Sequence, residues 1–251
     1  MRAHAFVLHL TRARARRQTA QALLAACGLP GELWAAVDGA ALGAADLASE
    51  IGAHLFDPPY PFALRPGEIG CFLSHRRIWA EIVRRDLDFG LVLEDDVVLD
   101  AEVFPTALRL AARNVAALGY VQLQNRPARG PAMPLDQDGP NRLTLPVVAP
   151  VRASAQLISR AGAARLLEKA QRFDRPVDTF VQSHWVTGLR PGVVYPAGVR
   201  TVSDRLDGST IQVGRKPPSE RLWREWARFL YRRRVARHSR RSPAPMPETE
   251  A

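Results

Sequence analysis

Three consecutive carboxylates, Glu94, Asp95 and Asp96, interrupt the aliphatic run GLVLEDDVVLD at residues 90–100. Burying adjacent anions is costly, because each loses its hydration and like charges repel one another. Either a divalent cation or a set of basic side chains must therefore offset their charge. Oxygen ligands suit Mg²⁺ or Mn²⁺, which could share its coordination with a substrate diphosphate. Salt bridges from arginines to a solvated strand end explain the same residues, so both interpretations stay open on this stretch alone.

Other polar residues could complete such a site. Arg12 and Arg16 directly follow the first apolar run, where guanidinium groups and the start of a helix could meet a phosphate. A charged helix face accounts for either arginine equally well. His75 falls on the apolar face of a predicted helix, where a buried, hydrogen-bonded histidine is the ordinary interpretation. Its neighbours Ser74 and Arg76 form a polar cluster that packing alone does not require.

Alternating strands and helices are predicted to position these residues. That alternation indicates an α/β sandwich with a largely parallel sheet, in which ligands collect at the carboxyl ends of strands. A regular strand would point Asp95 to one face and its two neighbours to the other, whereas a bend would let two of the three converge. The predicted strands are residues 5–10, 33–37, 91–93, 120–124 and 155–159. Helices are predicted up to residue 27 and at 68–86, 103–118 and 160–170. Residues 57–67 and 126–142 are predicted to be irregular, and the second of these stretches is predicted to be a mobile loop.

Composition indicates a globular protein. With 251 residues and 47% hydrophobic content, the chain can bury a substantial core in one sizeable domain. No apolar run approaches the length of a membrane span and the N-terminus does not resemble a signal peptide, so we expect a cytoplasmic protein. Cys27 and Cys71 need no disulfide there, and we find no CxxC, no cluster of cysteine and histidine and no zinc-like spacing.

The net charge of +10 is concentrated near the end of the chain. Residues 215–241 hold eleven Lys and Arg against two Glu, which leaves 24 basic and 23 acidic residues elsewhere. Because the remainder is almost neutral, a broad nucleic-acid surface is disfavoured. A helix with an aromatic stripe and flanking arginines predicts binding to an anionic membrane surface, although docking on the domain through its Trp residues is an alternative. The stripe consists of Leu222, Trp223, Trp226, Phe229 and Leu230.

The order of motifs resembles that of glycosyltransferase family 25, which includes bacterial lipooligosaccharide galactosyltransferases and the related collagen galactosyltransferases. The resemblance rests on LRPGEIGCFLSHRRIW at residues 64–79, followed by LVLEDDVVL at residues 91–99. VLHLTRARARR, AVDG, LISRAGAARLLEKA, PVDTF and SDRLDGSTI extend it over roughly residues 5–211. His9 and Thr11 stand where the family commonly has Asn and Asp, and Arg65 replaces a small hydroxyl residue that would cap the following helix.

The resemblance implies a GT-A-like, Rossmann-related fold and an inverting transfer from a UDP-sugar, often UDP-galactose, with Mn²⁺ or Mg²⁺ at the acidic motif. It suggests a catalytic domain at residues 1–214, a membrane-associating tail at 215–241 and a disordered end at 242–251. The acceptor would be a lipooligosaccharide, lipopolysaccharide or related glycan at the inner face of the bacterial inner membrane. A catalytically silent, membrane-associated binding module and a metal-dependent nucleotidyl or phosphoryl enzyme are the alternatives.

Family positions give each candidate residue an expected role. Asp178, in the PVD motif, is the candidate base that takes the proton of the acceptor hydroxyl, although it could equally be a helix N-cap or a metal or acceptor contact. His184 is a weaker candidate base. The expected metal ligands are Asp95 and Asp96, of which Asp96 is also catalytic, and the expected nucleotide-sugar contacts are Arg12, Arg16, Gly70, Ser74, His75 and Glu94.

Overall fold

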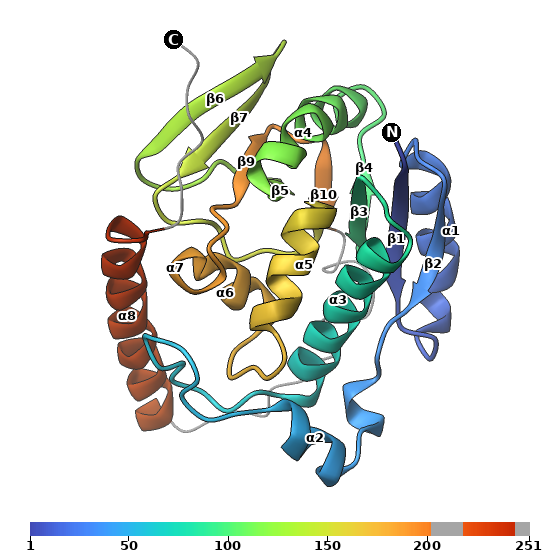
Figure 1. Cartoon of the computed structure of the whole chain (residues 1–251). Helices are drawn as coiled ribbons and strands as arrows, with labels where there is room; N and C mark the ends of the chain where they lie inside the picture. The colour runs from blue at the N-terminus through green and yellow to red at the C-terminus, as the bar shows by residue number, and fades with distance from the viewer. Residues whose placement is uncertain (202–217, 244–251) are drawn as a thin grey trace.

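A computed structural model describes residues 1–201 and 218–243 of the chain. One eight-stranded sheet forms its centre, and a small two-stranded sheet lies beside it (Figure 1). The motif SDRLDGSTI and nearly all of the predicted disordered end lie outside the described residues. The strands of the central sheet are β1 (Ala3–His9), β2 (Gly31–Ala35), β3 (Phe89–Glu94), β5 (Tyr120–Leu123), β6 (Ala132–Asp138), β7 (Asn141–Pro146), β8 (Ala155–Ser159) and β9 (Gly192–Tyr195); β4 (Val97–Leu99) pairs with β10 (Val199–Thr201).

The central sheet is mixed, with strand order β2-β1-β3-β8-β5-β9-β7-β6. The pairs β2–β1, β1–β3 and β5–β9 are parallel. The other four pairs are antiparallel, because β8 runs back between β3 and β5, and β7 and β6 form a hairpin at one edge. The prediction of a largely parallel sheet is therefore correct for the β2-β1-β3 region, which carries the acidic motif, and for the β5–β9 pair, but not for the other four pairs.

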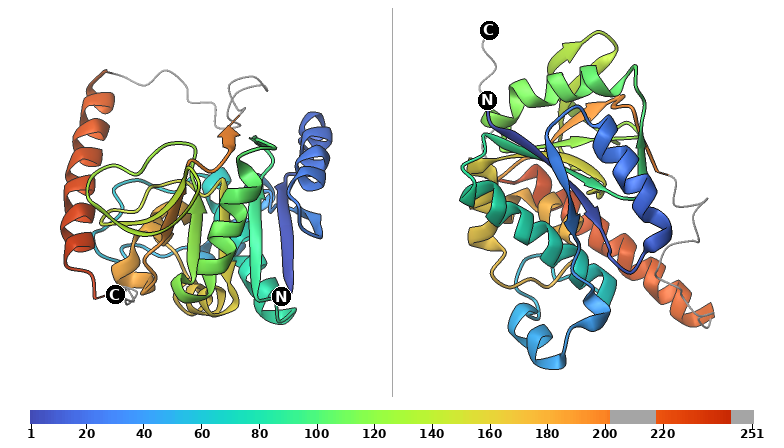
Figure 2. Two further views of the ribbon diagram at one scale, coloured as in Figure 1. Left: turned by 90° about the horizontal axis from the view of Figure 1, so that it is seen from above. Right: turned by 90° about the vertical axis from the view of Figure 1, so that its right-hand side faces the viewer.

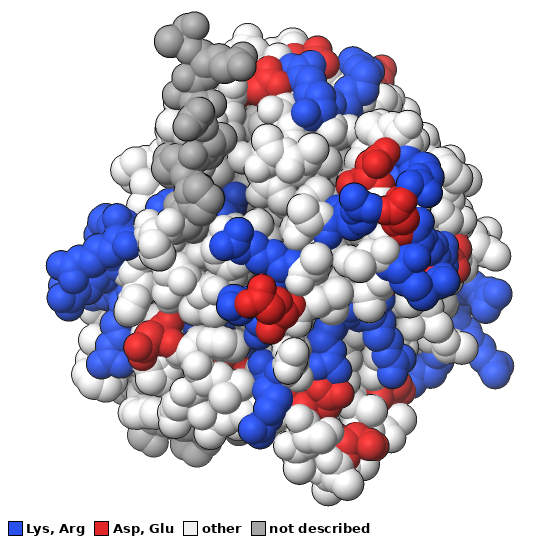
Figure 3. Space-filling view, in the orientation of Figure 1, with Lys and Arg blue, Asp and Glu red and all other residues white. Residues whose placement is uncertain are grey.

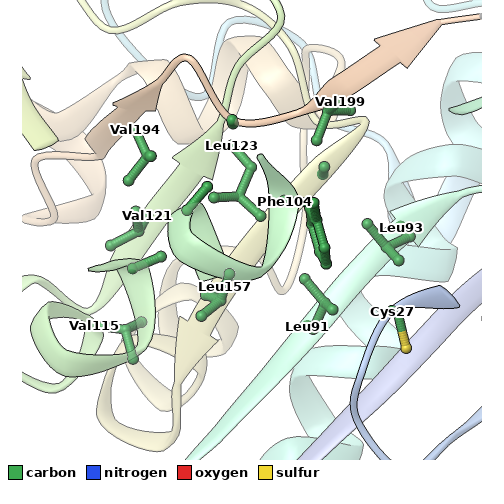
Figure 4. Close-up of a cluster of buried hydrophobic side chains, with 14 of the residues drawn as sticks. Cys27, Leu91, Leu93, Phe104, Val115, Val121, Leu123, Leu157, Val194 and Val199 are labelled. Carbon is green, nitrogen blue, oxygen red and sulfur yellow. The ribbon is translucent and has the colours of Figure 1, made fainter. Parts of the chain in front are cut away.

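Helices cover both faces of the sheet, as in a Rossmann-like sandwich, and the right-hand view in Figure 2 shows α1 and α3 on opposite sides of the strands. Alternation along β1 divides the core: Ala5 and Val7 pack with α1 and α4, whereas Phe6 and Leu8 pack with α3 and α5. Figure 4 shows Phe104 of α4 among side chains of several strands. The helices are α1 (Arg17–Ala26), α2 (Ala44–Glu50), α3 (Pro66–Arg84), α4 (Phe104–Leu118), α5 (Arg160–Lys169), α6 (Val177–Gln182), α7 (His184–Thr187) and α8 (Pro218–Arg240).

The prediction of an irregular loop at residues 126–142 is wrong for most of that stretch. β6 and the start of β7 occupy it, joined by a tight turn in which Gly139 has a φ of +57°. Leu143 and Leu145 of β7 are buried in the core. Weighing the Pro and Gly content above the alternation of apolar residues caused the error, because strands at a sheet edge tolerate proline.

Two helix starts follow from local chemistry. Ser159, the residue before the predicted helix at 160–170, caps α5, since its Oγ accepts a hydrogen bond from the backbone N–H of Gly162 (3.0 Å). The side chain of Arg65 makes no cap at α3, as predicted. Glu68 instead accepts from the backbone N–H of Arg65 (2.8 Å), and Pro66 begins the helix without a backbone N–H that would need an acceptor.

Helix α8 packs along one side of the domain (Figure 1) through a face that includes Ala227 and Val235. Tyr231 contacts Tyr60, and His238 stacks on Trp185 with ring centroids 5.3 Å apart. Docking through the Trp residues is correct in part, because the ring of Trp223 contacts that of Phe62 with centroids 6.3 Å apart, whereas Trp226 stays 61% exposed. Among the described helices, none combines the length and the apolar character needed to span a bilayer.

Candidate functional site

A pocket of about 480 Å³ lies at the carboxyl ends of β1, β2 and β3 and against the start of α3; we call it the strand-end pocket. Ligands of open α/β sheets collect at this kind of position. The sequence predicted this location from the acidic motif alone. The side chains that line the pocket and could act on a ligand are Arg12, Arg16, Asp38, Arg65, Cys71, Ser74, Glu94, Asp95 and Asp96.

The carboxylate of Asp95 is buried and paired with protein groups on both oxygens. Its Oδ2 lies 2.8 Å from Nδ1 of His9, and its Oδ1 accepts from Arg16 Nη1 at 2.9 Å. A cation bound by Asp95 would have to share an oxygen with one of these partners or displace that partner. His9, which departs from the family pattern, thus fixes the acidic motif to β1, and the ligand role of Asp95 stays a prediction.

Asp96 is in the opposite situation. Its Oδ1 is buried and has no hydrogen-bond partner among the described residues. Burial raises its pKa to about 6, and the charges of Glu94 and Asp95 add to the effect. A cation at this oxygen would supply the charge that the protein does not, so the residues present fit Mg²⁺ or Mn²⁺.

Arg12 and Arg16 both reach the strand-end pocket, as the sequence predicted. Arg12 Nε donates to Asp38 Oδ2 at 2.7 Å across the pocket wall. Asp38, which follows β2 in the AVDG segment, is a candidate that was not among the predicted site residues. The rule that ligands gather at the ends of parallel strands would have identified it, since β2 pairs with β1 in parallel.

Gly70 and Ser74, in the segment GEIGCFLS, support one wall of the strand-end pocket. Gly70 does not line it, and a Cβ on Gly70 would lie 2.4 Å from the carbonyl oxygen of Val37. Ser74 lines the pocket, but its Oγ accepts from the backbone N–H of Val37 (2.8 Å) and donates to Gly70 O (2.6 Å). Both residues thus hold α3 against the turn after β2, and their predicted nucleotide contacts stay predictions.

Gly70→Ala should destabilise the fold by about 1–3 kcal/mol, because the added methyl group meets backbone atoms that cannot move aside cheaply. Urea unfolding measures the loss. Gly43→Ala is the control, since the nearest atom to its Cβ, Asp46 Oδ2, is 3.4 Å away; as the N-cap residue of α2 it should cost less than Gly70→Ala, at most about 1 kcal/mol. Equal stability of the two variants would contradict this packing role.

His75 is fully buried beside the pocket. Its Nδ1 lies 2.9 Å from Nε2 of Gln156, whose Oε1 accepts from the hydroxyl of Tyr120. Its Nε2 has no hydrogen-bond partner in the described structure and lies 4.0 Å from Oε1 of Glu94. Burial would raise the pKa of Glu94, but the adjacent imidazole, Ser154 and the charge of Arg16 together outweigh this and hold that pKa below its ordinary value.

The comparison with known proteins decides what kind of protein carries this pocket. The sequence model of glycosyltransferase family 25, described as LPS biosynthesis protein, matches residues 2–128, just over half of the chain. The chain belongs to glycosyltransferase family 25. The matched region includes every residue that lines the strand-end pocket.

Relatives of this family 25 chain are mostly longer proteins. A glycosyltransferase 25 family member of Drosophila pseudoobscura pseudoobscura is 34% identical over 191 residues, which cover 71% of this chain and 29% of that protein. Procollagen galactosyltransferase 2 of Homo sapiens is 38% identical over 97 residues, or 37% of this chain and 15% of its own length. The human inactive glycosyltransferase 25 family member 3 is 41% identical over 96 residues, or 37% and 16%. The chain thus spans less than a third of these relatives.

Asp178 of this family 25 chain lies in the first turn of α6, where Pro176 is the N-cap residue, so the N-cap alternative is wrong for Asp178. Its Oδ1 accepts from the backbone N–H of Thr179 at 2.7 Å. Burial raises its pKa, and the charge of Glu94 adds to that rise, as suits a carboxylate that accepts a proton.

Asp178 does not line the strand-end pocket, and neither does His184, the weaker candidate base. His184 is buried, with Nδ1 2.7 Å from Ser242 Oγ and Nε2 3.2 Å from the carbonyl oxygen of Val147. Burial, with the nearby charge of Arg190, lowers its pKa to about 4. A neutral histidine engaged at both nitrogens is a structural residue of this family 25 fold.

Proposed function

We propose that this chain transfers a hexose, with galactose as the first candidate, from a UDP-sugar to a glycan acceptor, with inversion at the anomeric carbon. The observation that carries the proposal is the unpartnered buried oxygen of Asp96, in a pocket that also contains Arg12 and Arg16. A nucleoside diphosphate needs positive charge on its phosphates, which guanidinium groups supply. The galactosyltransferase names of the relatives support the choice of sugar.

In the proposed reaction, the acceptor oxygen forms a bond to the anomeric carbon while the bond from that carbon to the diphosphate breaks. Asp178 takes the proton of the acceptor hydroxyl, and its raised pKa lets it hold that proton. Arg16 and Arg12 orient the phosphates, and the backbone near Asp38 bounds the nucleoside end of the pocket. Mn²⁺ or Mg²⁺ held by Asp96, with Glu94 beside it, would stabilise the charge of the departing diphosphate.

The acceptor we propose is a lipopolysaccharide or lipooligosaccharide, which would be met at the cytoplasmic face of a membrane. The family description supports this class of acceptor, and so does the outer face of α8. That face presents Leu222 (74% exposed), Trp226 (61%) and Phe229 (54%), and basic side chains gather at the edge of the molecule where α8 lies (Figure 3). Exposed aromatic residues next to arginines favour an anionic lipid surface.

Donor turnover tests the first proposal. The protein is incubated with a panel of UDP-sugars and Mn²⁺, with and without a lipooligosaccharide extract, and UDP release is measured. Release that depends on both one sugar and the acceptor is the expected result. Absence of turnover with every donor would favour a catalytically silent binding module. The name of the human relative that is called inactive supports this alternative. Acceptor-independent cleavage of nucleotides that carry no sugar would favour a nucleotidyl or phosphoryl enzyme.

Sedimentation with anionic phospholipid vesicles tests the membrane proposal. Trp226→Ser combined with Phe229→Ser should weaken binding by at least about tenfold, because the two exposed rings lose apolar contact with the lipid. Leu55→Ser with Val151→Ser is the control, since these exposed apolar residues lie outside α8. Unchanged binding in the α8 variant, or no binding by the wild-type protein, would sink the membrane role and favour packing of α8 against another protein surface.

A further inference from the structure

Three side chains with different donor atoms converge on the wall of the strand-end pocket. Cys71 and His75 lie one helical turn apart on α3, so they project on the same side. Glu94 faces them from the end of β3, with its Oε1 3.9 Å from Cys71 Sγ and 4.0 Å from His75 Nε2. One donor atom from each residue lies within 4.8 Å of the other two, so the expectation of no cysteine and histidine cluster is wrong.

The imidazole of His75 makes this more than a chance cluster. The ring is fully buried, and Nε2 is directed toward Glu94 with no hydrogen-bond partner in the described part of the chain. A buried polar atom without a partner costs about 1–3 kcal/mol. The other ring nitrogen is held by Gln156, which fixes the ring so that Nε2 faces the cluster.

We propose that Cys71, His75 and Glu94 form a second cation site that takes Zn²⁺ and that Zn²⁺ there inhibits transfer. A sulfur, nitrogen and oxygen set suits Zn²⁺, whereas Mg²⁺ and Mn²⁺ prefer oxygen ligands alone. Cys71 and Glu94 both line the strand-end pocket, so the ion can enter from it and would keep an open coordination position toward it. The inhibition rests on the proposed function; the binding does not.

Zn²⁺ binding needs no co-reactant, because every proton that the ion displaces has an acceptor. The thiol of Cys71 releases its proton to solvent as sulfur binds the ion. His75 stays neutral, because its proton moves from Nε2 to Nδ1, and Nδ1–H then donates to Oε1 of Gln156 after that amide rotates. The hydroxyl of Tyr120, which now donates to Gln156, accepts from the rotated amide nitrogen instead. Inhibition follows because Glu94 leaves the substrate side of the pocket to bind the ion.

Cd²⁺ is the probe for binding, since a cadmium–thiolate bond gives a charge-transfer band in the near ultraviolet. The wild-type protein and Cys27→Ser should each bind one Cd²⁺ with such a band, because Cys27 is buried outside the cluster. Cys71→Ser should lose the band, and His75→Gln should weaken binding by at least about tenfold. A band that persists in Cys71→Ser, or none in the wild-type protein, would overturn the site.

A second measurement needs no variant. Stoichiometric Zn²⁺ should slow the alkylation of Cys71 at least about tenfold, as read by peptide mass spectrometry, because the bound sulfur is not nucleophilic. Equal alkylation with and without Zn²⁺ would also overturn the site. For the inhibition, added Zn²⁺ should lower the UDP release rate of the wild-type protein in saturating Mn²⁺ at least about tenfold. Zn²⁺ binding with undiminished turnover would overturn the inhibition, whereas Zn²⁺ binding in a protein without transferase activity would overturn only the proposed function.

Discussion

Asp96→Asn is expected to lower the transfer rate by about two to three orders of magnitude while making the cation-free protein more stable. The activity falls because the amide supplies no negative charge to hold Mn²⁺ beside the departing diphosphate. Stability rises because the substitution removes a buried negative charge that lies close to those of Glu94 and Asp95. Opposite changes in activity and stability are the signature of a residue kept for function.

The gain in stability from Asp96→Asn should increase as the pH rises. The pKa of Asp96 is raised from 3.8 to about 6, so the folded protein holds that proton more tightly than the unfolded chain. The contribution of this bound proton to the free energy of unfolding is therefore fully present below pH 4 and is lost as the pH rises through 6. With allowance for partial exposure, the loss at pH 8 is about 2 kcal/mol.

Urea unfolding in EDTA at pH 4 and pH 8 measures this effect. The advantage of Asp96→Asn should be present at pH 8 and nearly absent at pH 4. Asp88→Asn is the matched control, because Asp88 is an exposed carboxylate at the opposite end of β3. Added Mn²⁺ should stabilise the wild-type protein and not the Asp96→Asn variant. Full activity in that variant would remove the cation from the proposed mechanism.

Arg175→Met is expected to reduce the free energy of unfolding by about 3–5 kcal/mol, the largest effect on stability that we predict. Arg175 is fully buried, and its Nε donates to Asp174 Oδ1 at 2.7 Å. Its other nitrogens donate to the carbonyl oxygens of Phe56 and Pro58 and to the hydroxyl of Tyr231 on α8. Removing the guanidinium leaves the Asp174 charge buried without its cation.

A double-mutant cycle separates the ion pair from simple packing. Asp174→Leu with Arg175→Met should cost less than the sum of the two single changes, because neither charge is then left alone. Arg172→Met is the control, since Arg172 donates from the surface to the carbonyl oxygen of Ile51. A loss below about 1 kcal/mol for Arg175→Met would contradict the structural role of this buried pair.

The apolar pattern of α8 predicted a stripe on the helix but not the direction in which that stripe faces. The sequence identified the stripe of apolar residues on a basic helix, and a stripe ordinarily faces the core. In the fold, Ala227 and Val235 take the docking side, and Trp226 and Phe229 face outward. Rotation of the helix about its axis depends on which partner surface lies opposite, and that surface comes from residues 60–62 and α7 rather than from the helix.

By itself, the sequence determined the strand that ends in Glu94, the helix that carries His75, the cap at Ser159 and the family to which the chain belongs. These are properties of short segments, whose apolar period and turn chemistry act locally. Tertiary structure alone decided which carboxylate is free: Asp95 finds His9 and Arg16, 86 and 79 residues away, while Asp96 finds no hydrogen-bond partner among the described residues. Adjacent side chains of an extended chain point in different directions, so what each one meets depends on distant segments that only folding brings together.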